Sequence, residues 1–269
     1  MRLRSFVAAT VAFASTIDAQ VQYASKAAAD VAVGKAMAKT SSPTSSIPGK
    51  TFNRFVNIWL ENTDFDMAAG DPSLAWVATQ GITLTNYLAL THPSQPNYIG
   101  AVGGSTHWVF GDWFVRISRS QRTIVDLLDA KGVSWSEYQE DMPYSGFQGD
   151  YVNQKNGAND YVRKHNPLIS YDSVSEHESR IAKIKNLTMF YEDLKNDALP
   201  QWMFITPNMT SCGHDSSVTV AGTWTRSFLE PLLRDKNFMK NTLVLLTFDE
   251  TESYSSDNRV FSHHGDGGE

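Results

Sequence analysis

Ser94 stands in a polar turn between two prolines, directly before a run of small residues that favours a helix. A hydroxyl at the start of a helix faces unpaired backbone N–H groups and the positive end of the helix dipole, which stabilise a phosphate or a developing oxyanion. Pro96 suits a first helical position, because its missing N–H would have no partner there. The pattern fits an anion or nucleophile site, but taken alone this stretch favours the alternative, a serine N-cap that opens a helix packed closely at Gly100.

Other polar side chains follow apolar segments of strand length. Because the carboxyl ends of parallel strands meet at one edge of an open α/β sheet, we expect these groups to line one cleft. Several carboxylates in one cleft repel one another unless a cation or a bound proton offsets them. Such ligands suit a divalent metal ion, which would lower the pKa of a serine beside it and polarise a phosphoryl oxygen. The groups are Glu61 and Asn62, then Ser94 and Asn97, then Asn208, His214 and Asp215, and finally Asp249 and Glu250.

The elements that must position these groups alternate between strand and helix. Strands are predicted at residues 55–60, 82–90, 133–138, 202–205 and 242–248, and helices at residues 74–79, 123–131, 174–185, 189–196 and 224–233. This alternation predicts an α/β fold, with a mostly parallel central sheet between two layers of helices. Residues 141–172 have little periodicity, and a loop of this length inside a domain is usually functional.

The 269 residues, with a formal charge of −6 and 41% hydrophobic side chains, suffice for one sizeable domain, and nothing in the charge suggests a nucleic-acid partner. Residues 1–19 have the basic start, short apolar run and small residue of a secretory signal cleaved near Ala19, so the protein is expected to be secreted. The apolar run is too short for a stable membrane anchor. Residues 20–50 are predicted to be a flexible lead-in or propeptide, and residues 51–269 to form the domain.

The single cysteine, Cys212, excludes an internal disulfide. Two N-x-S/T sequons begin at Asn186 and Asn208, and only Asn186 is predicted to carry a glycan, because Asn208 falls in the expected site. Asn62 could instead cap the following helix, and Glu250 could be a solvated carboxylate. His263 and His264 are expected to lie in an exposed tail.

Several motifs together resemble the fungal acid phosphatases of the phosphoesterase family, which also contains bacterial phospholipase C, and this group is similar to a branch of the alkaline phosphatase-like superfamily. The resemblance covers roughly residues 53–261 and implies a three-layer αβα sandwich of the alkaline phosphatase-like kind. It is carried by the joint order of ENTDF at residues 61–65, QGITLTNY at 80–87, THPSQPNYI at 91–99, TPN at 206–208 with GHD at 213–215, and TFDE at 247–250.

The resemblance also implies roles for individual residues. Ser94 matches the nucleophile that becomes phosphorylated, and Asn97 matches an amide that holds a phosphoryl oxygen. Lys164 and His165 belong to a KHNP motif, where they would neutralise the phosphate and protonate the leaving alkoxide. His214 is expected to act with these catalytic residues, whereas the metal-binding residues of the implied divalent site are Glu61, Asn62, Ser94, Asp215, Asp249 and Glu250.

Two features depart from the family pattern. Cys212 stands where relatives carry an aspartate before GHD, and a soft thiolate suits hard cations less well. The ending after Phe261 does not resemble the family, so the domain is expected to be incomplete at its C-terminus.

The sequence therefore predicts a secreted acid phosphatase that hydrolyses small-molecule phosphate monoesters through a phosphoserine at Ser94. One alternative is a phospholipase C-type phosphodiesterase that acts on phosphoglycerol headgroups, because the same site would serve both reactions. Another is a non-catalytic phosphoester-binding protein or an inactive truncated form. The oligomeric state stays open.

Overall fold

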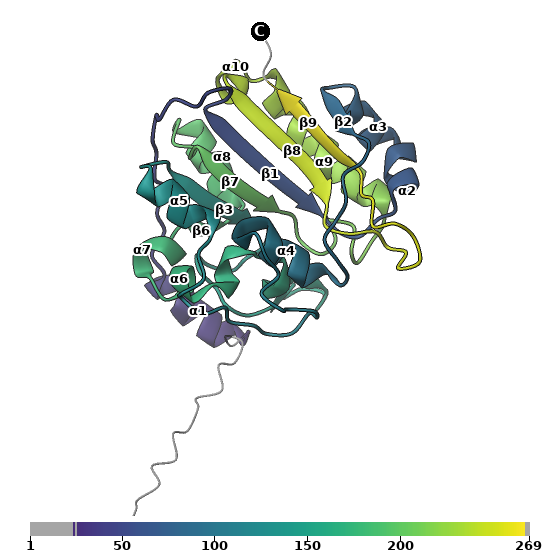
Figure 1. The fold of residues 1–269 in the computed structure, drawn as a ribbon. Helices are drawn as coiled ribbons and strands as arrows, with labels where there is room; N and C mark the ends of the chain where they lie inside the picture. The colour runs from purple at the N-terminus through teal and green to yellow at the C-terminus, as the bar shows by residue number, and fades with distance from the viewer. Residues whose placement is uncertain (1–23, 25, 267–269) are drawn as a thin grey trace, which may run out of the picture.

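A seven-stranded sheet runs through the part of the chain that the computed structural model describes, residue 24 and residues 26–266 (Figure 1). Its order is β2 (Ile82–Leu84), β9 (Ser262–Asp266), β8 (Thr242–Phe248), β1 (Arg54–Leu60), β7 (Trp202–Thr206), β3 (Trp135–Gln139) and β6 (Ile184–Asn186). All neighbours from β8 to β6 are parallel. β9 runs antiparallel to both β8 and β2. The predicted α/β class with a mostly parallel sheet is confirmed.

Two layers of helices cover the sheet, and each layer buries its own hydrophobic cluster. One layer consists of α2 (Phe65–Gly70), α3 (Pro72–Ala78), α8 (Thr188–Lys195), α9 (Val218–Arg234) and α10 (Lys236–Met239). The other consists of α1 (Ala28–Met37), α4 (Ser94–Gly103), α5 (Ile124–Ala130), α6 (Asp172–Ser175) and α7 (Glu178–Ile181), with the 3-10 turns η1 (Arg163–His165) and η2 (Leu168–Ser170) on the same side. The hairpin β4 (Tyr151–Val152) and β5 (Asn159–Tyr161) completes the described elements.

The alternation along β1 determines which face receives the site. Ile58 and Leu60 pack into the cluster under α3 and α9, whereas Trp59 packs into the cluster under α4. Successive side chains of a strand point to opposite faces. The same period of two therefore carries Glu61, one residue beyond the strand, to the α4 face.

The helix α4 begins at Ser94 itself, with Pro93 as its N-cap, so Ser94 is the first helical residue and Pro96 the third. The prediction that Pro96 opens the helix is wrong by two residues, and Ser94 does not act as an N-cap. Close packing at Gly100 is confirmed, because a Cβ atom there would lie 2.4 Å from Cδ1 of Leu90. The helix is buried along nearly its whole length, which fixes the position of its first turn.

The single helix predicted over residues 174–185 is wrong. The chain forms the short helices α6 and α7 and then enters the sheet as β6, which pairs with β3. Ile184 is completely buried there, so packing against β3 overrides the helical pattern of the sequence. The strand predicted over residues 82–90 is also shorter, because only β2 is regular.

The exposed tail predicted for His263 and His264 is also wrong. Both residues belong to β9, which lies between β8 and β2 and pairs with both. His263 is only 3% exposed. An unpaired strand edge exposes backbone N–H and C=O groups that can pair with other chains. By pairing with β8, β9 satisfies these groups along one side of that strand.

The segment before residue 51 packs against the domain, which differs from the expected flexible lead-in. Val31 of α1 is buried in the cluster under α4. Beyond α1, Ser45 Oγ donates to the side chain of Gln201, and the backbone of Ile47 both donates to and accepts from the same side chain. Lys185 Nζ donates to Ser42 Oγ at 3.0 Å. Whether this segment is removed as a propeptide stays a prediction.

The signal predicted at residues 1–19 lies outside the described residues, so secretion stays a prediction at this point. Among the residues that the structure does describe, no helix has the length and apolar character needed to cross a membrane.

Candidate active site

The candidate site lies where β1 and β8 end, at the start of α4. The register pairs Leu60 with Phe248, and the N–H of Asp249 donates to the carbonyl of Leu60 at 3.0 Å. Glu61 and Asp249 are therefore neighbours at one edge of the sheet, as the strand-end pattern predicts. In Figure 1 the arrowheads of β1 and β8 point toward α4 and the loops around it.

Ser94 lies between two carboxylates. Its Oγ is 3.1 Å from Oε2 of Glu61 and 3.1 Å from Oε1 of Glu250, with the hydroxyl as donor in both contacts. A serine hydroxyl has one proton, so it can donate to only one of these oxygens at a time. Ser94 is 3% exposed and lies at the positive end of α4. The hydroxyl thus has two candidate proton acceptors and a position that favours an anion.

Glu61 is completely buried and makes polar contacts with three side chains. Besides Ser94, the hydroxyl of Tyr98 donates to Oε1 at 2.6 Å, and Nε2 of His165 lies 3.1 Å from the same oxygen. Burial raises the pKa of Glu61 to about 7. Burial and the charge of Glu61 also raise the pKa of Tyr98 well above its usual range, so the phenol stays a neutral donor.

Asp249 and Glu250 add two more buried carboxyl groups, each 1% exposed. Burial, followed by the charges of Glu61 and Glu250, raises the pKa of Asp249 well above its usual range. Among the described residues, Oδ2 of Asp249 has no hydrogen-bond partner. Burial raises the pKa of Glu250 to about 7, and its Oε2 lies 2.5 Å from Nδ1 of His92. The alternative that Glu250 is a solvated carboxylate is therefore wrong.

One cation faces this acidic cluster. Lys164 Nζ donates to Oδ2 of Asp112 at 2.7 Å. Burial opposes its charge, but the pair with Asp112 and the charges of Glu61 and Asp249 raise the pKa of Lys164. Burial and the charge of Lys164 lower the pKa of His165 well below its usual range, so its imidazole is neutral. The long loop predicted to be functional thus brings Lys164 and His165 to the site.

His214 lies beside His165, with 5.8 Å between the ring centroids, and its Nδ1 is 2.7 Å from Oδ1 of Asp215. The other carboxylate oxygen of Asp215 accepts a hydrogen bond from Asn159 at 3.3 Å. Both residues of this pair are partly exposed. Asp215 therefore contacts the outer side of the site rather than the buried carboxyl cluster.

Two predicted site residues, Asn97 and Asn62, have no hydrogen bond to the buried carboxyl groups in the part of the chain that the structure describes. Asn97 accepts hydrogen bonds from the N–H groups of Leu90 and Thr91 and donates to the carbonyl of Thr91, so its amide closes the turn before α4. Asn62 is half-buried beside Glu61. It is not a helix cap, because α2 has Asp64 at its N-cap position. The phosphoryl and metal-binding roles of Asn97 and Asn62 stay predictions.

Three further residues of the site were not predicted from the sequence. Tyr98 follows Ser94 by four residues, and this spacing on a helix would have placed both side chains on one face. His92 belongs to the same motif, two residues before Ser94. Asp112 had no signal in the sequence, because a loop brings it back to Lys164 from the far end of α4.

The buried carboxyl groups have the type of oxygen that a divalent metal ion prefers, but they are not arranged as a metal site. The oxygens of Glu61, Asp249 and Glu250 are hard ligands, and Asp249 Oδ2 has no partner among the described side chains. Burial raises the pKa of the Cys212 thiol well above its usual range, so a neutral thiol adds no ligand charge. Within residues 26–266, no three or more His, Cys, Asp or Glu side chains lie in an arrangement that would hold a metal. Metal binding therefore stays a proposal, which rests on the kind of donor atoms present.

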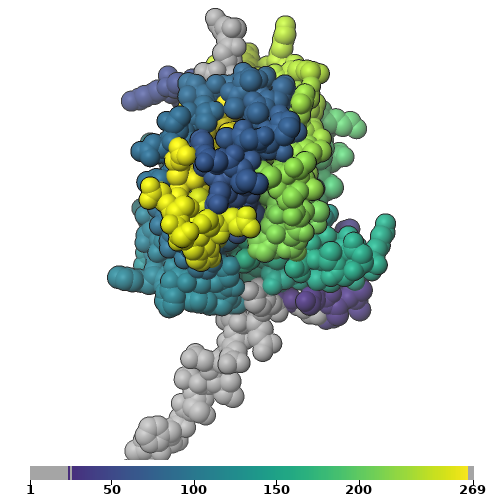
Figure 2. Space-filling model, turned by 90° about the vertical axis from the view of Figure 1, so that its right-hand side faces the viewer, coloured from purple at the N-terminus to yellow at the C-terminus, as the bar shows by residue number. Residues whose placement is uncertain are grey.

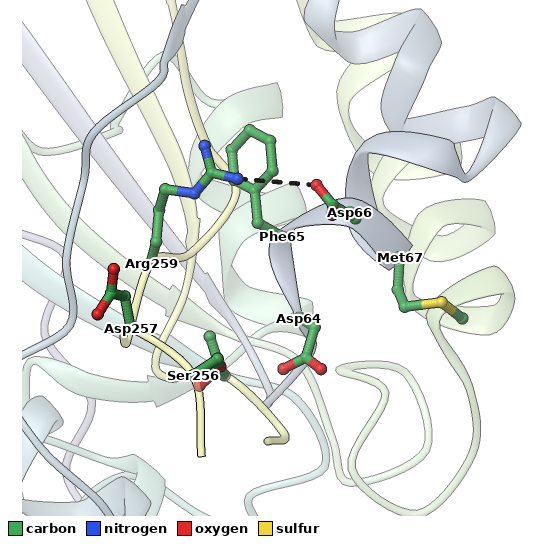
Figure 3. A pocket seen from close by; sticks show the side chains of 8 residues that line it. Asp64, Phe65, Asp66, Met67, Ser256, Asp257 and Arg259 are labelled. Carbon is green, nitrogen blue, oxygen red and sulfur yellow. Dashed lines mark ion pairs between the residues drawn. The ribbon is translucent and has the colours of Figure 1, made fainter. Parts of the chain in front are cut away.

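A separate surface hollow of about 610 Å³ lies where α2 meets the loop after β8. Figure 2 shows these segments in blue and yellow, side by side on one face of the molecule. Arg259 lies over the ring of Phe65 at 3.9 Å and 3.7 Å from Asp66 (Figure 3). The hollow contains none of the predicted site residues.

A phosphoesterase family profile matches residues 69–259 of the chain. An acid phosphatase of Aspergillus fumigatus is 53% identical over 222 residues, which are 82% of this chain and 50% of that protein. A probable acid phosphatase of Kluyveromyces lactis is 56% identical over 219 residues, 81% of this chain and 52% of that protein. The chain thus spans about half the length of these curated relatives.

A solved structure supports the fold. A protein in the alkaline phosphatase superfamily from Vibrio parahaemolyticus superposes with a TM-score of 0.53 over 88% of this chain and 68% of that one, at 9% sequence identity. At this identity the likeness concerns the fold alone. The predicted alkaline phosphatase-like architecture is confirmed.

Proposed function

The chain belongs to the phosphoesterase family, and from this premise we propose that it is a secreted acid phosphatase that hydrolyses small-molecule phosphate monoesters through a phosphoserine at Ser94. One observation carries the proposal: the hydroxyl at the first residue of α4 is within hydrogen-bond reach of two buried carboxylates. The names of the curated relatives support the reaction class. The signal-like pattern of residues 1–19 supports secretion.

In the first step, Oγ of Ser94 attacks phosphorus while the ester P–O bond breaks. The proton of Oγ passes to Glu250 or Glu61. Burial raises the pKa of each of these carboxyls to about 7, so the ionised form that can accept the proton is the minor form at acidic pH and becomes more abundant as the pH approaches 7. In-line attack places the leaving oxygen on the opposite side of phosphorus, and Lys164 gives it a proton there, so that an alcohol departs. Water then cleaves the phosphoserine, releases inorganic phosphate and restores Ser94. In this second step the neutral Lys164 takes a proton from that water and the carboxyl returns its proton to Ser94, so the proton count balances.

The neighbouring residues supply charge and orientation. Lys164 is the cation placed to face the phosphoryl oxygens, and Asp112 holds its ammonium group in position. The neutral His165 and Tyr98 both contact Oε1 of Glu61 and keep that carboxylate in place. Together they orient the base and offset part of the negative charge of the substrate.

The carboxyl oxygens of Glu61, Asp249 and Glu250, which surround Ser94, are the donors that would have to move closer together to hold a divalent metal ion. When bound, such an ion would neutralise the phosphoryl oxygens and lower the pKa of the serine hydroxyl. Asn62 and Asp215 were predicted as further ligands, and their participation is part of the same proposal.

The test is intact-protein mass spectrometry of the purified protein before and after brief mixing with an aryl phosphate at acidic pH. A mass increase of one phosphate, mapped to Ser94 and absent from Ser94→Ala, is the expected result. Ser105→Ala is a matched control, because Ser105 follows the opposite end of α4 and should leave the adduct unchanged. No adduct and no turnover, with divalent metals supplied, would exclude this mechanism and favour a phosphoester-binding protein.

A further inference from the structure

The loop that follows α4 carries large aromatic side chains in contact with solvent. Phe110 is 75% exposed, Trp113 is 46% exposed and Trp108 is 93% exposed. Apolar side chains that gather on a surface frequently mark a place where a ligand or partner binds. The position of the loop relative to Ser94 indicates which of these rings is close to the chemistry.

Residues 111–113 are fixed to the residue that follows the nucleophile. The N–H of Gln95 donates to Oδ1 of Asp112 at 3.0 Å. The side-chain amide of Gln95, in the orientation that satisfies both acceptors, donates to the carbonyls of Gly111 at 3.2 Å and Trp113 at 2.7 Å. Gln95 is only 1% exposed, so these hydrogen bonds are shielded from water. Since Asp112 also accepts from Lys164, the loop is attached to two parts of the site.

Two rings of this loop, those of Phe110 and Trp113, contact each other, and that of Trp113 also contacts the loop backbone. A Cβ atom on Gly111 would lie 1.7 Å from the ring of Trp113, so the indole lies directly against the glycine backbone. Phe110 meets Trp113 edge to face, with 5.1 Å between the ring centroids. A preorganised aromatic surface loses little freedom when it binds a ligand.

A further exposed ring lies at the other carboxylate of the site. Tyr254 is 64% exposed and stacks on His92 at 4.0 Å between centroids. His92 in turn contacts Glu250, which accepts from Ser94. Aromatic surfaces therefore adjoin the phosphate site through Gln95 on one side and through His92 on the other.

We propose that Phe110, Trp113 and Tyr254 form an aromatic wall that binds the leaving group of the substrate and selects phosphate monoesters of flat aromatic alcohols over those of small polyols. This inference rests on the proposed phosphatase function and names the substrate class of the same site. Stacking and edge-to-face contacts favour an aromatic leaving group over a hydrated polyol, which loses hydrogen bonds to water in such surroundings.

The test compares kcat/KM for 4-nitrophenyl phosphate with kcat/KM for glycerol 3-phosphate in wild type and in the Phe110→Ala/Trp113→Ala double variant. The ratio of the two values is expected to fall about fivefold to tenfold, mainly through a higher KM for the aryl ester. Trp113→Phe keeps a ring and should restore most of the ratio. Gly111→Ala, which displaces the indole, should lower the ratio with all three aromatic residues still present.

Trp108→Ala is the matched control. It removes a more exposed tryptophan from the same loop. Its neighbour His107 packs against Tyr171 and Gly103, at the end of α4 opposite to Ser94, so no effect on the substrate ratio is expected. The ratio of this variant should equal that of wild type. Thermal unfolding of each variant verifies that the fold is intact.

The outcomes separate the two proposals. Absence of turnover of both esters by the wild-type protein would count against the phosphatase function itself. Turnover of both esters with an unchanged ratio in the double variant would overturn the aromatic wall alone. A loss confined to phosphatidic acid in vesicles, with the soluble aryl ester unaffected, would also overturn it and would assign the loop to a lipid surface.

Discussion

Two buried polar clusters on opposite faces of the sheet differ in how their charges are balanced. Beneath α8, Lys185 Nζ donates to Asp193 at 2.6 Å, and the hydroxyl of Tyr138 donates to the same oxygen at 2.7 Å. One cation and one anion meet there, with neutral donors around them. Beneath α4, Glu61, Asp249 and Glu250 bring three carboxyls together, with Lys164 as the nearby cation.

The comparison separates a structural cluster from the proposed catalytic one. Burying a charge is costly unless it is paired and hydrogen-bonded, and the Lys185 cluster meets this condition. The carboxyl cluster meets it only when protons or cations are taken up, which is the property that a phosphoryl-transfer site requires. The unbalanced charges of Glu61, Asp249 and Glu250 therefore support the proposed catalytic role of this cluster.

The largest effect on stability is expected from breaking the Lys185–Asp193 ion pair. Lys185→Met leaves Asp193 buried without its cation and should lower the free energy of unfolding by about 3–5 kcal/mol. Urea denaturation measures the change. The double variant Lys185→Met/Asp193→Leu removes both charges and should recover most of the loss. A single variant as stable as wild type would show that the pair is not the structural centre of this region.

Removing one charge from the cluster of Glu61, Asp249 and Glu250 should instead raise the free energy of unfolding. The pKa of Glu61 is raised from 4.5 to about 7, so the folded state binds more protons than the unfolded state between these values. Wild type therefore loses stability as the pH rises through this window. Glu61→Gln should be more stable than wild type by about 1–3 kcal/mol at pH 8 and nearly equal to it at pH 4. Denaturation with a chelator present measures the difference.

The same substitution should reduce turnover, because it removes an acceptor of the Ser94 proton. A stability difference that does not depend on pH would contradict the raised pKa. Equal turnover by Glu61→Gln and wild type would show that Glu250 alone serves as the base.

His263 is a third case, a buried group with no hydrogen-bond partner for either ring nitrogen among the described residues. Burial lowers its pKa to about 4. The unfolded state therefore binds more protons between pH 4 and 6.5, and wild type should lose about 1–2 kcal/mol as the pH falls through this window. Relative to wild type, His263→Leu should gain stability at low pH. Identical pH profiles would show that the pKa of His263 is the same in the folded and the unfolded state.

The smallest effect is expected where charges are exposed. Glu230 pairs with Arg226 and Arg234 along the surface of α9, each at a spacing of four residues. Glu230→Gln should change the free energy of unfolding by no more than about 0.5 kcal/mol. A loss above 1 kcal/mol in urea denaturation would mean that burial is not what separates strong clusters from weak ones here.

Much of the site could be predicted because strand ends are local signals. Glu61 and Asp249 each follow an apolar run directly, and parallel pairing then brings them together. Asp112 could not be predicted, because its contact with Lys164 depends on how two loops fold back. The position of Asn97 was predicted, but its hydrogen bonds to the preceding turn depend on backbone geometry that the sequence does not state.

The fold shows the same limit. The long apolar strands β1, β7 and β8 were predicted closely, because their burial on both faces gives continuous hydrophobic runs. The strands β6 and β9 were missed, since each is short and polar and becomes a strand only by pairing with a neighbour. Long-range pairing, rather than local propensity, makes strands of these two segments.

The contacts of Gln201 with the segment before residue 51 bear on how the molecule should be dissected. Its side chain accepts from Ser45 and Ile47 and donates to the carbonyls of Ile47 and Asn53, so all its hydrogen-bonding capacity is used. A shortened chain that begins at residue 51 would leave the carboxamide oxygen of the buried Gln201 without both of its donors, and its NH₂ group with Asn53 as the one remaining of these two acceptors. We therefore expect residues 41–47 to unfold together with the domain, so limited proteolysis of the native protein should spare them.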